Sequence, residues 1–287
     1  MNLSHILQRA TREHWSTGHF NISNLEQFRA IMDAARNQKA HPIIGLSEGE
    51  RKHIGLTEAA SLREAFEKEY GIPVFLNADH SKSVESASAA VDAGFNSIHI
   101  DASEHSYDEN IGMTRAVVEY ARKRSPDISV EGELGFVPGE SKVDASAISI
   151  DASAYTNPDT VADFVQKTGV DRLAIFVGNV HGLHASEPKL DIVRIAAIRK
   201  NLPETVALVL HAGSGIPDED IKAAVAAGIA NIHINTEIRV AFTEALHETM
   251  EKAPDETTPY KYSKPSMEAV RAVVENKFIV FGSSGRV

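Results

Sequence analysis

The chain has 287 residues, of which 43% are hydrophobic and 24% are charged, and its formal net charge is −11. This length fits a single α/β barrel, which commonly needs about 250 residues. The acidic balance argues against a nucleic-acid-binding protein, because phosphate recognition requires a basic face. The chain contains no cysteine. Disulfides and thiolate chemistry are therefore excluded, and any metal ligands must be His, Asp or Glu.

The first 15 residues lack the continuous apolar segment of a signal peptide, and no apolar run is long enough to span a membrane. We expect a soluble, cytoplasmic protein with neither nucleic-acid nor membrane partners.

Short apolar, β-branched runs alternate with longer amphipathic segments along the chain. The predicted strands are Gly18–Asn21, Pro42–Ser47, Pro73–Asp79, Ser97–Asp101, Ile128–Gly135, Arg172–Gly178, Ala207–Ala212 and Asn231–Thr236. The predicted helices between them include Leu25–Asn37, Val84–Ala93, Met113–Lys123, Thr160–Thr168 and Asp218–Ala227. This alternation implies parallel βαβ units. Eight such units favour a closed (β/α)8 TIM barrel, and the lack of a G-x-G-x-x-G motif after the first strand argues against a dinucleotide-binding sheet.

No linker or break in composition divides the chain, so residues 1–287 are expected to form one domain. The polar, proline-containing stretch Ala253–Lys264 is expected to be a loop that precedes a last helix, Met267–Glu275. Because both faces of a barrel strand are covered, we expect the strands to be apolar inside the barrel.

Polar residues collect where the predicted strands end. They are Asn21, Ser47, Asp79, His80, Asp101, Ser103, Glu133, His181, His211, Asn235 and Thr236. The carboxyl ends of barrel strands share one rim, and that rim carries the active site of such enzymes. We therefore expect these side chains to form a site.

Three histidines, His80, His181 and His211, lie at or just past the ends of the third, sixth and seventh strands. Three neutral imidazoles can hold zinc and leave a fourth position open for substrate or water. The alternative is that each is a hydrogen-bonded residue of the rim. Glu133 and Asp101 on the same rim favour metal binding, although such a site also suits cobalt, nickel or iron.

Asp79 directly precedes His80. Its carboxylate could act as a general acid and base on a substrate hydroxyl, or it could only orient a metal-bound histidine. The spacing of the residues does not separate these two roles.

A glycine-rich segment, His211-Ala-Gly-Ser-Gly-Ile-Pro, follows the seventh strand and leads into a helix. Its glycines let backbone N–H groups approach a ligand, and a helix amino terminus favours an anion. Barrels often bind phosphate with the loops after strands seven and eight, to which Asn235 and Thr236 belong. Gly-Ser-Gly alone can also be a simple turn, but its position here favours phosphate binding.

Together these motifs resemble the class II, metal-dependent fructose-bisphosphate and tagatose-bisphosphate aldolases, from about Phe20 to the carboxyl end. The matching pieces are Phe20-Asn-Ile-Ser-Asn, Ala78-Asp-His, Ile100-Asp-Ala-Ser, Val130-Glu-Gly-Glu-Leu-Gly, Tyr155-Thr-Asn-Pro, Gly178-Asn-Val-His-Gly, Leu210-His-Ala-Gly-Ser-Gly, Asn235-Thr-Glu-Ile-Arg and Phe281-Gly-Ser-Ser-Gly-Arg.

The resemblance implies that His80, His181 and His211 hold zinc, and that Asp101 and Glu133 offer a neighbouring or alternative metal position. It also implies that Asp79 exchanges a proton with the C4 hydroxyl of the substrate. The residues that it assigns to the phosphate of dihydroxyacetone phosphate, often with a monovalent cation nearby, are Gly182, Gly213, Ser214, Asn235 and Thr236. The rim residues assigned to substrate binding are Asn21 and Ser47. A homodimer or homotetramer is expected by the same resemblance.

The chain departs from the family pattern at several positions. Where a mobile loop usually carries a glutamate that moves the carbon-bound proton, this chain has Ser141, and Glu140 stands one residue earlier. Either the loop shifts to bring Glu140 into that role, or the proton transfer is impaired. His233 stands where the strand-eight motif of the family has asparagine, and Asn77 stands where the family has a histidine before the Asp-His pair.

An Asp-Pro-Arg element that often engages the second phosphate is missing. Lys261 and Lys264 stand in that region, where they either substitute for it or are surface charges. The expected function is an aldolase that cleaves or forms a phosphorylated ketose. Two alternatives are a zinc lyase or epimerase of the same lineage, acting on a substrate with one phosphate or none, and a catalytically weak relative that binds metal and sugar phosphate. The sequence does not distinguish fructose from tagatose substrates.

Overall fold

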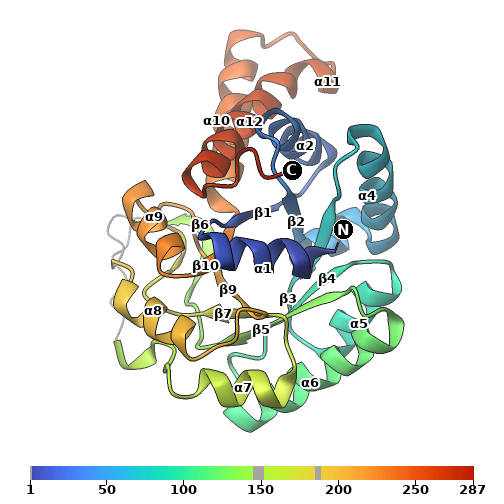
Figure 1. Cartoon of the computed structure of the whole chain (residues 1–287). Coiled ribbons are helices and arrows are strands. Elements are labelled where there is room, and N and C mark those ends of the chain that lie inside the picture. The colour runs from blue at the N-terminus through green and yellow to red at the C-terminus, as the bar shows by residue number, and fades with distance from the viewer. Residues whose placement is uncertain (1, 145–151, 185–188) are drawn as a thin grey trace.

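Eight parallel strands close into a barrel at the centre of the molecule (Figure 1). The computed structural model describes residues 2–144, 152–184 and 189–287. The barrel strands are β1 (Thr17–Asn21), β2 (Pro42–Leu46), β3 (Phe75–Ser81), β4 (Ser97–Ile100), β5 (Ser129–Leu134), β7 (Arg172–Ile175), β9 (Ala207–Leu210) and β10 (Ile229–Ile234). Each strand pairs with the next in this order, and β10 pairs with β1. The prediction of a TIM barrel is confirmed.

Helices surround the barrel and cover its outer face (Figure 1). Those that correspond to predicted helices are α2 (Leu25–Gln38), α5 (Val84–Asp92), α6 (Tyr107–Arg124), α7 (Val161–Thr168) and α9 (Asp218–Ala226). The start of α6 lies before the predicted Met113, because Ser106 and Glu109 form a capping box there.

Further helices were not among those predicted. They are α1 (Leu3–Glu13), α3 (Glu48–Ile54), α4 (Leu56–Tyr70), α8 (Ile192–Lys200), α10 (Thr236–Lys252), the short helix α11 (Pro259–Tyr262) and the short 3-10 helix η1 (Ala152–Ala154). The stretch expected to be a loop therefore contains α11, and the last helix, α12 (Lys264–Val280), is longer than predicted. A proline near the start of each of these two helices is compatible with a helix, because the first turn needs no N–H donor there.

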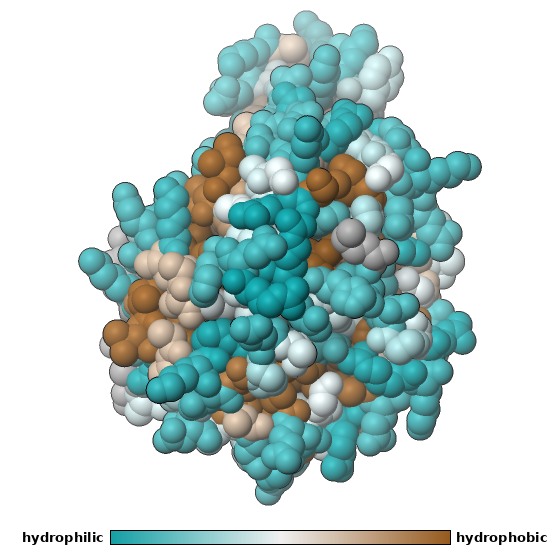
Figure 2. Space-filling model, in the orientation of Figure 1, coloured by the Kyte–Doolittle hydropathy of each residue, from teal (hydrophilic) through white to brown (hydrophobic). Residues whose placement is uncertain are grey.

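The helix α1 covers the amino-terminal end of the barrel. Leu3 and Leu7 are buried in one apolar cluster with Phe75 and Ala230 of the strands. In Figure 1 the helix crosses in front of the strands, and Figure 2 shows that the surface over it is hydrophilic. The helix is therefore amphipathic and closes the end of the barrel opposite the predicted rim.

The interior of the barrel is polar, so the expectation of apolar strands is wrong for their inward face. Arg172 and Glu131 are fully buried, and Arg172 Nη1 lies 2.8 Å from Glu131 Oε2. Arg172 Nη2 also donates to Asn77 Oδ1 at 3.2 Å and to Ser97 Oγ at 2.6 Å. These buried charges are tolerated because each has a close partner. The apolar residues of the same strands, such as Ile98, face the helices and belong to the main core.

A second sheet of two strands is formed by segments that come after the barrel strands β5 and β7 in the chain. It pairs β6 (Gly139–Asp144) with β8 (His181–His184) in parallel. Among the described helices, none combines the length and the apolar content that crossing a bilayer requires.

Candidate functional site

A pocket opens on the rim at the carboxyl ends of the strands, where the sequence predicted a site. The predicted residues that line it are Asn21, Ser47, Asp79, His80, His181, Gly182, His211, Ser214, Asn235 and Thr236. The other predicted site residues, Asp101, Glu133, Glu140 and Gly213, do not line this pocket. The rim therefore brings together side chains that are far apart in the sequence.

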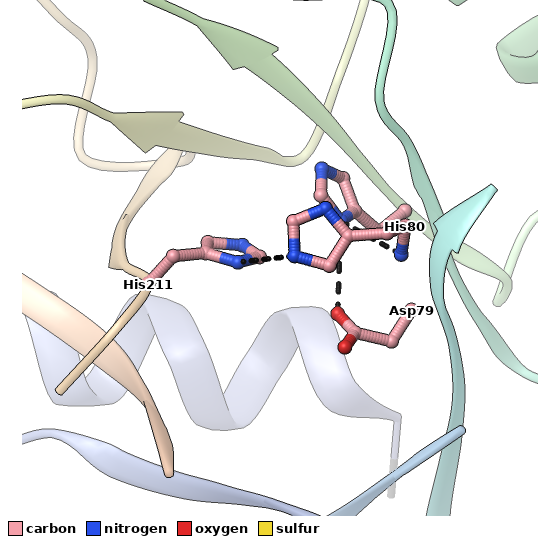
Figure 3. Close-up of side chains that lie close together, drawn as sticks. Asp79, His80 and His211 are labelled. Atoms are coloured by element: carbon pink, nitrogen blue, oxygen red, sulfur yellow. Dashed lines mark hydrogen bonds and ion pairs between the residues drawn. The ribbon is translucent and has the colours of Figure 1, made fainter. Parts of the chain in front are cut away.

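His80 and His211 point toward each other across the pocket (Figure 3). His80 Nε2 and His211 Nδ1 are 3.2 Å apart. The ring of His181 lies farther away, with its centroid 5.3 Å from that of His80 and 6.2 Å from that of His211. The three predicted histidines are thus neighbours, and two of them are in direct contact.

A local irregularity in β3 lets both Asp79 and His80 face the site. Side chains of a regular strand alternate between its two faces. The pairing register with β4 shifts between Ala78 and Ser81, and His80 has a φ of 46°. This left-handed backbone is unusual for a residue other than glycine. The alternation is therefore broken at Asp79 and His80, so that these two adjacent side chains both line the pocket.

Carboxylates hold the far nitrogens of both contacting histidines. His80 Nδ1 lies 2.7 Å from Asp101 Oδ2, and His211 Nε2 lies 2.7 Å from Glu131 Oε1. Such carboxylate partners fix the ring orientation of metal-binding histidines. Burial alone would lower the pKa of His80, but Asp79 and Asp101 raise it above its ordinary value.

His181 has a different electrostatic environment. Burial, together with the charges of His80 and His211, lowers the pKa of its imidazole to about 3. It is therefore neutral at physiological pH, which is the form that binds a metal.

His99 on β4 is a site residue that the sequence analysis missed. One ligand atom from each of four residues, Asp79, His80, His99 and His211, lies within 4.8 Å of the others, so this described group could hold a metal ion. His99 Nδ1 accepts the backbone N–H of His80 at 3.2 Å, and its Nε2 lies 3.3 Å from Glu133 Oε2. The alternation of Ser97 and His99 with two isoleucines in β4 was the signal in the sequence.

A second group that could hold a metal ion consists of His80, Asp101 and Glu133. Lys82 Nζ also lies 2.7 Å from Asp101 Oδ2, so a lysine already partly neutralises this group.

Asp79 is buried at the pocket floor with its two oxygens in different surroundings. Its Oδ2 accepts a hydrogen bond from Asn21 Nδ2 at 3.0 Å. Its Oδ1 has no hydrogen-bond partner among the described residues, and it lies 3.5 Å from His233 Nδ1 and 3.7 Å from His99 Nδ1. Burial alone would raise the pKa of Asp79, but His80, His233 and His99 lower it well below its ordinary value. The carboxylate is therefore ionised and can accept a proton.

The residues predicted to bind phosphate lie on β8, after β9 and at the start of α10. Gly213 lies just beneath the pocket, where its N–H donates to the carbonyl of His233 at 2.9 Å. Ser214 Oγ accepts the N–H groups of Asn235 and Glu237, both at 3.3 Å. The serine thus caps α10 and fixes the helix amino terminus beside the pocket.

Glu140 lies on the outer side of the rim. Its carboxylate is mostly exposed and pairs with Lys142 at 3.1 Å. It lines a shallow depression next to the pocket, which it shares with His80 and Asp101, whereas Ser141 borders both. The structure therefore holds Glu140 near the site and outside the pocket that contains Asp79.

Two departures from the family pattern, His233 and Asn77, both lie close to His19, and His233 also lines the pocket. His233 stacks on His19, with ring centroids 3.5 Å apart and planes inclined by 10°. His19 Nε2 lies 3.0 Å from Asn77 Nδ2. Lys261, by contrast, lies on α11 and pairs with Glu256 at 3.3 Å. It is not among the residues that line the pocket.

Comparisons with known proteins agree with this geometry. Residues 1–286 match the family described as fructose-bisphosphate aldolase class-II. The fructose-bisphosphate aldolase of Geobacillus stearothermophilus is 38% identical over 289 residues, covering 100% of this chain and 98% of that protein. A probable fructose-bisphosphate aldolase of Bacillus subtilis is 37% identical, with 100% and 99% covered. The crystal structure of the YdjI aldolase from Escherichia coli K12 superposes with a TM-score of 0.84 at 31% identity, covering 99% of this chain and 98% of that one. With its barrel, its rim of histidines and carboxylates and these relatives, the chain belongs to the class II fructose-bisphosphate aldolase family.

Proposed function

We propose that this protein is a zinc-dependent aldolase that reversibly cleaves a phosphorylated ketose, of the fructose- or tagatose-bisphosphate type, to dihydroxyacetone phosphate and an aldehyde. The observation that carries the proposal is that one pocket is lined by Asp79, His80 and His211. The same pocket is lined by the glycine- and serine-rich segments around Gly182 and Ser214. A proton acceptor, imidazole ligands and an anion-binding backbone are the parts that this cleavage requires.

Two of the three donors that we assign below are spaced as for a zinc ion. Two nitrogens bound to one tetrahedral zinc lie about 3.3 Å apart, and His80 Nε2 and His211 Nδ1 are separated by 3.2 Å. Their other nitrogens are held by carboxylates, as is usual for metal-bound histidine. We assign His80, His181 and His211 as ligands, with Asp101 and Glu133 as the neighbouring position. A zinc ion bound there supplies Lewis acidity to the reaction.

In cleavage, Asp79 takes the proton of the substrate C4 hydroxyl. The C4 oxygen then forms the carbonyl of the aldehyde, the bond between C3 and C4 breaks, and its electron pair stays on the dihydroxyacetone phosphate half. Asn21 holds Asp79 Oδ2 by a hydrogen bond of 3.0 Å, and the buried Oδ1 has no hydrogen-bond partner among the described residues. Completing the reaction requires a proton on C3, and Glu140 is the candidate donor after a movement of β6 toward the pocket.

The remaining assignments complete the proposal. Gly182, Gly213, Ser214, Asn235 and Thr236 bind the phosphate, with a monovalent cation nearby, and Asn21 and Ser47 contribute to substrate binding. We further propose one domain over residues 1–287, a homodimer or homotetramer, and a cytoplasmic location.

The test is a coupled cleavage assay of zinc-loaded protein with fructose 1,6-bisphosphate and with tagatose 1,6-bisphosphate. Triose phosphate release that stops with a chelator and returns with zinc supports the proposal, and the two rates reveal the preference at C4. No release from either substrate by protein with stoichiometric zinc would contradict it and would favour a lyase or epimerase acting on another substrate. Arg271→Gln, on the outer helix α12, serves as the control variant.

A further inference from the structure

Arg239 lies between the phosphate-binding part of the pocket and the strand β6. It belongs to the first turn of α10, where its N–H donates to the carbonyl of Asn235 at 3.1 Å. Its side chain lines the same pocket as Gly182, Ser214 and Thr236. The sequence analysis did not assign this residue to the site.

Arg239 brings a positive charge to the pocket, and no ion pair joins it to an acidic side chain in the described part of the chain. It is the one lysine or arginine among the described residues that line the pocket, whereas Glu50 and Asp79 are acidic. The nearby carboxylate of Glu237 is engaged elsewhere, by Lys277 Nζ at 2.9 Å and by the N–H of Gly215 at 2.7 Å. In a chain with a net charge of −11, a phosphate dianion needs a local cation. An arginine guanidinium suits phosphate oxygens because it offers several donors in one plane.

The same guanidinium also holds β6. Arg239 Nη1 donates to the carbonyl of Ser141 at 2.9 Å. A guanidinium has five N–H donors, so this bond leaves others for a ligand. Ser141 directly follows Glu140, and a contact at Ser141 therefore restrains the backbone that carries the Glu140 carboxylate.

We propose that Arg239 binds the phosphate of the substrate and, through Ser141, couples occupancy of the phosphate subsite to the position of β6. The inference rests on the proposed function because it takes the substrate to be a phosphorylated ketose. A bound phosphate fixes the guanidinium, the fixed guanidinium holds Ser141, and β6 is stabilised when substrate is present.

The experiment compares Arg239→Gln and Arg239→Lys with Arg271→Gln in the zinc-loaded enzyme. Arg271 is a suitable control because it is another partly exposed arginine, it lies on α12, and it contacts Glu275. Loss of a charged hydrogen bond lowers binding by about 10- to 100-fold. We expect that factor in the KM of Arg239→Gln for the bisphosphate and in its affinity for inorganic phosphate. The lysine variant should recover part of both.

Hydrogen–deuterium exchange tests the coupling directly. Inorganic phosphate should slow exchange of residues 139–144 in the parent protein and in Arg271→Gln, but not in Arg239→Gln. Unchanged phosphate affinity in Arg239→Gln, or phosphate protection of β6 that persists in that variant, would overturn the inference. These binding measurements need no turnover. If the parent protein cleaves neither ketose, the proposed function fails, and the phosphate titrations still decide the role of Arg239.

Discussion

Replacing Arg172 by methionine should strongly destabilise the barrel. Arg172 and Glu131 are both fully buried, with 2.8 Å between Nη1 and Oε2. At this distance the attraction is about 6 kcal/mol for an effective dielectric constant of 20. Arg172→Met leaves the Glu131 charge buried without its cation and removes the donor to Asn77 and Ser97. Breaking one side of a buried pair costs about 3 to 5 kcal/mol, and we expect a loss of that size in the free energy of unfolding.

The assay is urea unfolding of metal-free protein, followed by the fluorescence of Trp15, the one tryptophan. Metal is removed because a ligand that binds only the folded state would add to its stability. The matched control is Arg122→Met, whose partner Asp171 lies 2.6 Å away in a partly exposed pair, with side chains 31% and 22% exposed. Here the expected loss is about 1 kcal/mol.

A double variant, Arg172→Met with Glu131→Gln, separates the charge from the packing. The amide removes the unpaired charge and keeps an acceptor for His211 Nε2, so part of the lost stability should return. The reasoning is refuted if Arg172→Met costs no more than Arg122→Met, or if the double variant is no more stable than the single one.

Three further predictions concern the site and the pH dependence of folding. Asp79→Asn should lower kcat by about 10²- to 10⁴-fold with unchanged zinc content, and a normal rate would exclude Asp79 as the base. His99→Asn should weaken zinc binding by about 10- to 100-fold in chelator competition, whereas His14→Asn, at an exposed helix end, should not. Burial lowers the pKa of His41 to about 4, below its value of about 6.5 in the unfolded chain. The unfolded state therefore takes up this proton first, and stability falls as the pH decreases from about 6.5 to about 4. At pH 4.5 the loss should be about 1 to 2 kcal/mol after allowance for solvent screening. His41→Asn should show a smaller difference in unfolding free energy between pH 7 and pH 4.5, and an unchanged difference would contradict the assignment.

The positions of the strands and of the rim were predictable because they depend on local patterns. His80 and His211 could be placed on one rim from the parallel topology alone, since the carboxyl ends of barrel strands must meet. That the two imidazoles are in contact could not be predicted, because it depends on the register shift in β3 and on the left-handed backbone of His80.

The polar interior of the barrel was missed although its signal was present. Polar residues recur at every second position, as in Glu131 and Glu133 of β5 and in Asn231 and His233 of β10. This period of two indicates a strand with one polar face, whereas the apolar expectation came from the average parallel sheet. The pairings between strands, such as Arg172 with Glu131, depend on the closure of the barrel and have no local signal.

Because α1 closes one end of the barrel and paired polar side chains fill its interior, the described part of the chain offers a ligand no passage along the barrel axis. The ketose and both of its fragments must then share the opening at the rim. Product release is then ordered: the fragment bound nearer the opening leaves first, and the fragment bound deeper leaves second. Product-inhibition kinetics should therefore report the order in which the two fragments are stacked inside the pocket.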